Sequence, residues 1–220
     1  MASISEQGHA FPAVWQQFLQ LDQVSASDRL HWPDWHRGRP QFCFWGIAVE
    51  DAQLGREMQR LRQRLSPFLR PDYQRSEHIT LYAAGFVMPQ ASQPDETDGR
   101  QLARQAALIR SAMNGPWQLQ TGAVSSFAGA PFVEVIDSDG RLAALRRALL
   151  GCFADDRDVP FTPHLTLGLY RQPFAVRLLA ERLAQLSLPA LTIPVSAISL
   201  FSYHTGHLCS PLKIEQQLPC

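Results

Sequence analysis

The chain has 220 residues, of which 45% are hydrophobic and 18% charged, and its 20 lysines and arginines balance 20 aspartates and glutamates. This length and composition predict a globular protein of one domain, or of two small lobes that share a core. The neutral balance argues against a protein that coats long nucleic acid, because such binding depends on neutralising many phosphates. A local basic pocket that holds a nucleotide or an RNA end is still compatible with it.

Neither a targeting signal nor a membrane segment is expected. Residues 1–10 lack a basic region followed by an apolar run, and no stretch approaches the roughly 18 apolar residues of a membrane span. The 4 cysteines form no CxxC pair, which predicts reduced thiols and no zinc site. We therefore expect a cytoplasmic monomer with no metal, no other cofactor and no membrane partner.

The first 40 residues predict an aromatic-rich arm. Residues 11–21 favour a short helix, and residues 31–36 (HWPDWH) are aromatic without a period. We interpret the segment as an arm whose tryptophans cover a hydrophobic edge. The alternative is a lid that stacks on a substrate.

Residues 42–127 predict the order strand, helix, strand, helix, strand. The run 42–50 is continuously apolar, as in a buried strand, and residues 78–86 form a second strand. Residues 87–99 have loop composition, and residues 117–127 are extended. Apolar residues at helical spacing define the two helices: Leu54, Met58, Leu61, Leu65 and Phe68, then Leu102, Ala106, Ile109 and Met113.

The second half repeats this plan. Strands are expected at 131–137 and 164–170, each followed by a helix, and residues 191–203 and 209–218 close the chain as a hairpin. The repeat predicts an α+β fold of two pseudosymmetric β-α-β-α-β lobes, about 41–128 and 129–220, with facing antiparallel sheets around a central cleft and helices outside. The inward positions of the two helices are Leu142, Leu145, Leu149 and Phe153, then Val176, Leu179, Leu183 and Leu186.

One four-residue motif opens a strand in each half: HITL, which starts at His78, and HLTL, which starts at His164. In a strand, a histidine and the threonine two residues later share a face, so Thr80 and Thr166 line the cleft beside the histidines. Two imidazoles and two hydroxyls without a carboxylate cluster suit a tetrahedral anion better than a metal. The opposite faces belong in the core: Ile79, Leu81, Leu165 and Leu167.

These residue types suggest acid–base chemistry. One neutral histidine deprotonates a nucleophile, the protonated one donates to the leaving oxygen, and the hydroxyls hold phosphate oxygens. Tyr82 and Tyr170 extend the same faces, and they either stack a base or ribose or pack at the cleft edge. Arg171 and Arg75 are candidate phosphate contacts, against the simpler interpretation of solvated charges.

The duplicated motif resembles that of the two-histidine phosphoesterase superfamily, and within it the bacterial 2′-5′ RNA ligase / RNA cyclic phosphodiesterase branch. Residues 161–167 (FTPHLTL) are similar to its second motif, and residues 198–202 and 212–219 to its closing strands. The resemblance covers about residues 42–218. It implies a metal-independent hydrolase that opens a 2′,3′-cyclic phosphate of an RNA end or nucleotide, commonly leaving a 2′-phosphate. His78 and His164 would be its acid and base, and Thr80 and Thr166 would bind phosphate.

The chain departs from that branch in its basic residues. Tyr82 stands where a basic residue often follows the first motif, and Arg171 comes later than expected after the second. A small cyclic nucleotide therefore fits at least as well as a long RNA. Three alternatives stay open: an exonuclease that trims RNA 3′ ends, a 2′-5′ RNA ligase, and a non-catalytic nucleotide-binding module.

Overall fold

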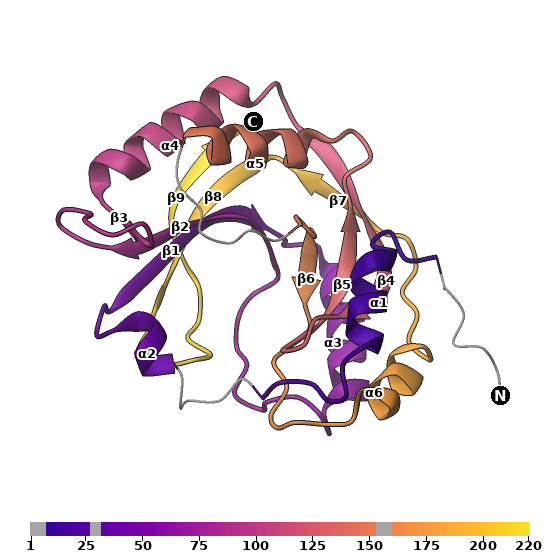
Figure 1. Ribbon diagram of the computed structural model, residues 1–220. Coiled ribbons are helices and arrows are strands. Elements are labelled where there is room, and N and C mark those ends of the chain that lie inside the picture. Colours follow the sequence, from indigo (N-terminus) through magenta and orange to yellow (C-terminus); the bar gives the residue numbers. More distant parts are fainter. Residues whose placement is uncertain (1–7, 27–31, 153–159) are drawn as a thin grey trace.

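Two curled β-sheets, with helices around their outer sides, make up the computed structural model (Figure 1), which describes residues 8–26, 32–152 and 160–220. The elements in chain order are α1 (Pro12–Leu19), α2 (Trp32–His36), β1 (Gln41–Ala48), α3 (Ala52–Leu65), β2 (His78–Val87), β3 (Glu96–Thr97), α4 (Gly99–Ala112), β4 (Trp117–Ser126), β5 (Pro131–Ile136), α5 (Arg141–Cys152), β6 (His164–Thr166), α6 (Val176–Leu183), β7 (Thr192–Val195), β8 (Ala197–His204) and β9 (Lys213–Pro219). No helix among these is long and apolar enough to cross a bilayer.

The sheets confirm the expected α+β class. Sheet A has the strand order β3-β2-β1-β8-β9, and sheet B has the order β6-β5-β4-β7. All neighbouring strands pair antiparallel except β2 and β3, which pair parallel. The repeated element order is also present, as β1-α3-β2-α4-β4 and then β5-α5-β6-α6-β7.

The sheets do not follow the expected division near residue 128. Strand β4 comes from the first repeat but belongs to sheet B, whereas β8 and β9 come from the second half and belong to sheet A. The chain crosses between the sheets at residue 196, between β7 and β8. The exchange gives β1 a partner on each side, since Trp45 pairs with Tyr82 and also with Leu200. Without β8, the second edge of β1 would be open to other chains.

Local signals place the helices as expected. The side chain of Asp51 caps α3 by accepting from the backbone N–H of Leu54, and Asp98 caps α4 in the same way. The predicted faces of α3, α5 and α6 are buried in one core that also receives both sheets. Burial of each leucine there stabilises the fold by roughly 1.5–3 kcal/mol. Phe153 and the side chain of Cys152 lie outside the described residues, while Cys43, Cys209 and Cys220 are free thiols.

The described parts of the N-terminal arm pack on both sheets. Helix α1 lies against β4 and α6, with Trp15 and Phe18 buried in the main core. Beside sheet A, the Trp35 ring covers Phe42 and Phe86, with centroid distances of 5.1 and 4.7 Å, and stays 37% exposed. Residues 27–31, which include the first histidine of the HWPDWH segment, lie outside the described residues.

Candidate active site

His78 is the first residue of β2, in sheet A, where β2 pairs with β1 on one side and β3 reaches only Phe86 and Val87 on the other. Its Nδ1 lies 2.8 Å from the carbonyl oxygen of Ser76, and its ring lies 5.4 Å from Phe44 and 5.9 Å from Phe201. The side chain is nearly enclosed, since the residue is only 9% exposed. Burial penalises the charged imidazolium, so it lowers the pKa of His78 to about 4.

His164 is the first residue of β6, at the edge of sheet B. Its Nδ1 lies 2.7 Å from the carbonyl oxygen of Thr162, and its ring lies 5.0 Å from Phe127 and 5.2 Å from Phe132. The residue is half-buried, and burial lowers the pKa of His164 below its usual range.

The two motifs thus share a local hydrogen bond that the four-residue pattern does not reveal. In each, Nδ1–H donates to the carbonyl oxygen of the residue two positions earlier. A carbonyl oxygen can only accept, so the neutral ring carries its proton on Nδ1 and leaves the Nε2 lone pair available. Within the described ranges Nε2 of neither ring has a hydrogen-bond partner, so both can exchange a proton with a bound molecule.

A threonine stands two residues after each histidine, outside the apolar core. Thr80 and Thr166 are half-buried, and among the described residues neither hydroxyl makes a hydrogen bond. The apolar residues of both motifs, at positions 79, 81, 165 and 167, are all fully buried in the core. Gly46 pairs with Thr80, and a Cβ at Gly46 would lie 2.5 Å from the carbonyl oxygen of Ile79, so only glycine lets β1 approach the first motif this closely.

Arg62 of α3 ties the two motifs together. Its guanidinium pairs with the carboxylate of Glu77, the residue before His78, at an Nη2–Oε2 distance of 2.7 Å. The same group donates to the carbonyl oxygens of Thr166, at 3.3 Å, and Leu167, at 3.0 Å. Arg62 thus links the residue before His78 to the backbone of the second motif. Besides burial, the charge of His164 contributes to lowering the pKa of His78. Sequence reasoning missed Arg62 and Glu77, because a charge on a helix's polar face or in a loop carries no signal of its own.

Two backbone hydrogen bonds make a second connection, between the segment after α3 and the residues directly after the second motif. The N–H of Arg70 donates to the carbonyl oxygen of Leu169 at 2.9 Å, and the N–H of Arg171 donates to that of Phe68 at 3.0 Å. The Arg171 side chain is exposed, with its guanidinium 5.9 Å from the Phe174 ring. A phosphate contact by Arg171 therefore stays a prediction.

The expected substrate contact of the two tyrosines needs correction. Tyr82 is 1% exposed and Tyr170 is 0% exposed, so both rings belong to the core. For Tyr82 the reason is a β-bulge: Trp45 pairs with Tyr82 but the next residue, Gly46, pairs with Thr80, so the face alternation breaks between them. For Tyr170 the reason is that β6 ends at Thr166, and the tyrosine hydroxyl instead bonds to Ser126 at 2.8 Å.

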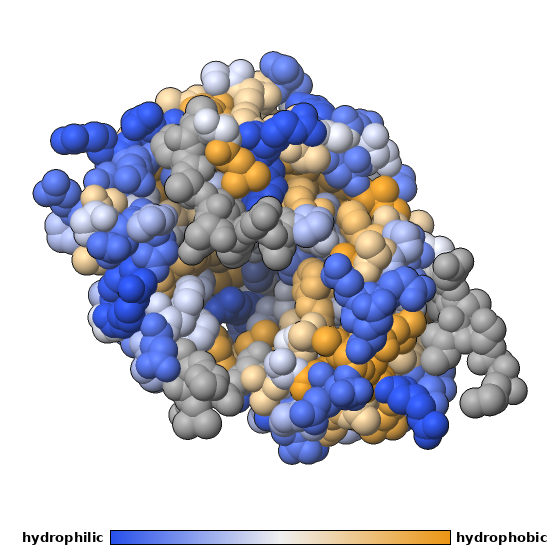
Figure 2. Space-filling view, viewed as in Figure 1, coloured by the Kyte–Doolittle hydropathy of each residue, from blue (hydrophilic) through white to orange (hydrophobic). Residues whose placement is uncertain are grey.

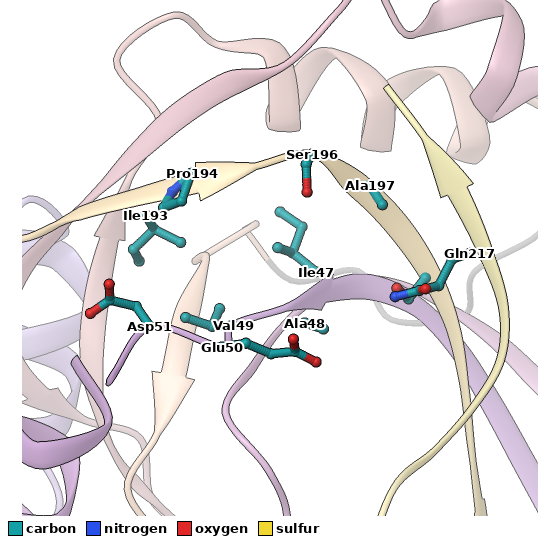
Figure 3. A pocket seen from close by; sticks show the side chains of 11 residues that line it. Ile47, Ala48, Val49, Glu50, Asp51, Ile193, Pro194, Ser196, Ala197 and Gln217 are labelled. Carbon is teal, nitrogen blue, oxygen red and sulfur yellow. The ribbon is translucent and has the colours of Figure 1, made fainter. Parts of the chain in front are cut away.

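Figure 2 shows a hollow in the face of the molecule where the ribbons of Figure 1 leave its centre open, with hydrophilic residues in its depth. A separate pocket of about 260 Å³ lies where β7 passes into β8 (Figure 3). No residue of either motif lines it, but Ala48 on its wall pairs with His78, so the pocket adjoins the first motif. Across the described part of the chain, no three histidine, cysteine or acidic side chains are grouped so that they could hold a metal ion.

Comparisons with known proteins agree with this fold. A family model described as the 2′-5′ RNA ligase superfamily matches residues 50–207. The fold is similar to that of Escherichia coli LigT complexed with 3′-AMP, with TM-score 0.53 and 14% identity over 82% of this chain and 98% of that one. It is also similar to TT0787 of Thermus thermophilus, with TM-score 0.53 and 15% identity over 81% and 97% of the two chains. No curated protein matches the sequence.

Proposed function

Since the chain belongs to the 2′-5′ RNA ligase superfamily, a group of phosphoesterases, we propose that it hydrolyses the 2′,3′-cyclic phosphate of a nucleotide or an RNA end without a metal. The observation that carries the proposal is the mirrored pair of histidines. Each ring is anchored through Nδ1 to a backbone carbonyl, keeps Nε2 available and has a threonine hydroxyl without a described partner two residues on.

The proposed reaction uses every one of these groups. Nε2 of one histidine takes a proton from water while the water oxygen bonds to phosphorus. The bond from phosphorus to one ribose oxygen breaks, and Nε2–H of the other histidine protonates that oxygen. The hydroxyls of Thr80 and Thr166 donate to the non-bridging oxygens, where negative charge builds. The product is a phosphomonoester at the 2′ or 3′ position.

The lowered pKa values support a role for the substrate in charging the site. In the free protein both rings are neutral at pH 7, because burial lowers the pKa of His78 and that of His164. A phosphate anion bound between them favours a protonated neighbour and raises its pKa. Substrate binding thus creates the acid, while the second ring stays neutral as the base.

Nucleotide-sized ligands suit the proposal. Escherichia coli LigT has been crystallised with 3′-AMP, and in another structure, with TM-score 0.51 to this chain, with NADP⁺. By analogy we propose a substrate of similar size, such as a free 2′,3′-cyclic nucleotide or a cyclic-ended RNA. The balanced charge of the chain is consistent with binding the end of an RNA rather than its length.

The test is a substrate panel of 2′,3′-cyclic mononucleotides, cyclic-ended oligonucleotides and ADP-ribose cyclic phosphate, with the product phosphate located by NMR. We expect turnover that EDTA does not reduce, and none in the double variant H78A/H164A. His207 lies exposed in the β8–β9 turn outside the site, so H207A is a matched control that keeps full activity. Turnover by the double variant would refute the proposal.

The same panel separates the alternatives. Stepwise shortening of labelled oligouridine identifies a 3′-end exonuclease. Joining of a cyclic end to an added 5′-hydroxyl oligonucleotide identifies a ligase, which the family's description also supports. Tight binding of a 2′-phosphonucleotide without turnover of any cyclic phosphate identifies a binding module.

A further inference from the structure

The loop before β2 carries an arginine whose charge has no acidic partner among the described residues. Within those ranges, Arg75 uses only one of its five N–H donors, from Nη2 to the carbonyl oxygen of Leu208 at 3.3 Å. Its Nε is buried without any hydrogen-bond partner there. A partly buried charge with unsatisfied donors is costly unless an anion completes it.

Three other arginines show how this chain normally satisfies such a group. Arg62 pairs with Glu77, Arg39 with Asp95 and Arg70 with Asp72, each at 2.8 Å or less. Each therefore has a structural role that is complete within the protein. Arg75 is different, because the described residues offer it no carboxylate.

Arg75 and His78 stand on the same aromatic surface. The Arg75 guanidinium lies 4.3 Å from the centre of the Tyr203 ring, which packs against Phe44 at 6.5 Å. Phe44 in turn lies 5.4 Å from the His78 ring. The ring contact holds the guanidinium in place, and among the described residues Nη1 and the second N–H of Nη2 have no hydrogen-bond partner. Paired N–H donors of this kind suit the oxygens of a phosphate. After burial, the positive charge of Arg75 is a further cause of the lowered pKa of His78, so the two groups are electrostatically coupled.

We propose that Arg75 binds a phosphate of the substrate on the His78 side of the cleft and supplies the cation that the two H-x-T motifs lack. The identity of the substrate rests on the proposed function; the anion site itself does not. The phosphate is either the cyclic one under attack or a 5′-phosphate on the same nucleotide, because both present the same oxygens to a guanidinium.

Steady-state kinetics of R75Q and R75K on two substrates test the proposal and distinguish the two phosphates. One substrate is adenosine 2′,3′-cyclic phosphate and the other is its 5′-phosphorylated form. We expect R75Q to lower kcat/KM by roughly 10–100-fold, as for a lost hydrogen bond to a charged group. R75K should recover part of the loss, since it restores the charge but not the fork. The control is R177Q, at an exposed position on α6.

Each outcome decides a point. An equal loss on both substrates assigns Arg75 to the cyclic phosphate, and a loss confined to the second assigns it to the 5′-phosphate. Unchanged kcat/KM on both, with turnover in the wild type, overturns the proposal. A drop in melting temperature that R75K shares, without a change in kcat/KM, marks a structural arginine and also overturns it.

Binding of inorganic phosphate, followed through the His78 ring signals by NMR, keeps the test independent of turnover. If the wild type hydrolyses no cyclic phosphate, the proposed function fails, but weaker phosphate binding by R75Q than by R177Q still supports the anion site. Equal binding by both variants refutes it. In the free protein, R75Q should also raise the pKa of His78, because burial remains but a nearby positive charge is removed.

Discussion

The two motifs have the same local chemistry in very different surroundings. The first lies in a ten-residue strand within a five-stranded sheet, and its nearly enclosed histidine has a pKa lowered by burial and further by the charges of Arg75 and Arg62. The second opens a three-residue edge strand, and its half-buried histidine has a pKa lowered by burial alone. The two repeats therefore share the hydrogen bond that holds each ring but differ in the environment that sets its charge. His78 and His164 can therefore take different roles in proton transfer even though their local geometry is alike.

Replacing one histidine at a time should have the largest effect on activity and should show how the two motifs differ. We expect H78A and H164A each to lower kcat by roughly 10²–10⁴-fold, since each removes one proton-transfer group. Each variant should also lose one limb of the bell-shaped pH profile, and a different limb in the two cases assigns base and acid. The measurement is kcat/KM against pH. Full activity in either single variant would contradict a two-histidine mechanism.

Removing one threonine hydroxyl should have the next largest effect. T80V and T166V each delete a donor to the charged phosphate oxygens, for which a loss of about 10²–10³-fold in kcat is typical. Valine keeps the shape and strand propensity, so the melting temperature serves as the control for folding. Unequal losses would show that the phosphate lies closer to one motif, and no loss in either would exclude the hydroxyls from the site.

Arg62 connects the surroundings of the first motif to the backbone of the second. R62M should shift the motifs relative to each other and lower kcat by up to about 10²-fold, because an ångström of misplacement is enough for such a loss. E77Q keeps the shape of its partner but removes the charge, so it should show a smaller loss. Arg64, on the same helix, has no ion pair with any described residue, and R64M is therefore the control. Equal activity of R62M and R64M would show that the bridge is dispensable.

The smallest expected effect is on stability in acid. The folded pKa of His78, about 4, lies below the ordinary 6.5, so the unfolded chain takes up the proton first as the pH falls. Stability is then complete above about pH 6.5 and is lost as the pH falls through the folded pKa. Between pH 7 and 5 this single group accounts for about 2 kcal/mol. H78Q should remove that part of the pH dependence in urea unfolding, whereas an unchanged dependence would show that His78 is not kept neutral by burial.

Much of the fold was predictable because helix and strand periods are local. The faces of α3 and α6 and the alternation across both motifs follow directly from the spacing of leucine and isoleucine. The exchange of β4 with β8 and β9 was not predictable, since periodicity shows that a strand exists but not which strand it pairs with. The position of the Tyr82 ring also depends on strand pairing, because a one-residue bulge places it in the core and not on the expected cleft face.

The site shows the same limit. Matched motifs predict four groups of the candidate site, at positions 78, 80, 164 and 166, because chemistry repeated at equivalent strand starts is a local signal. The arginines at 62 and 75 could not be separated from solvated charges, since their roles depend on which carboxylates and rings lie nearby in space. Backbone carbonyls, which orient both histidines, carry no residue-type signal at all.

The crossing of the chain between β7 and β8 has a consequence for how such a protein can change. Each sheet includes at least one strand from the other half of the chain, so neither half carries a complete sheet, and separating the halves would open a strand edge in both sheets. Deletion of either whole half therefore removes one histidine and also at least one strand of the sheet that holds the other.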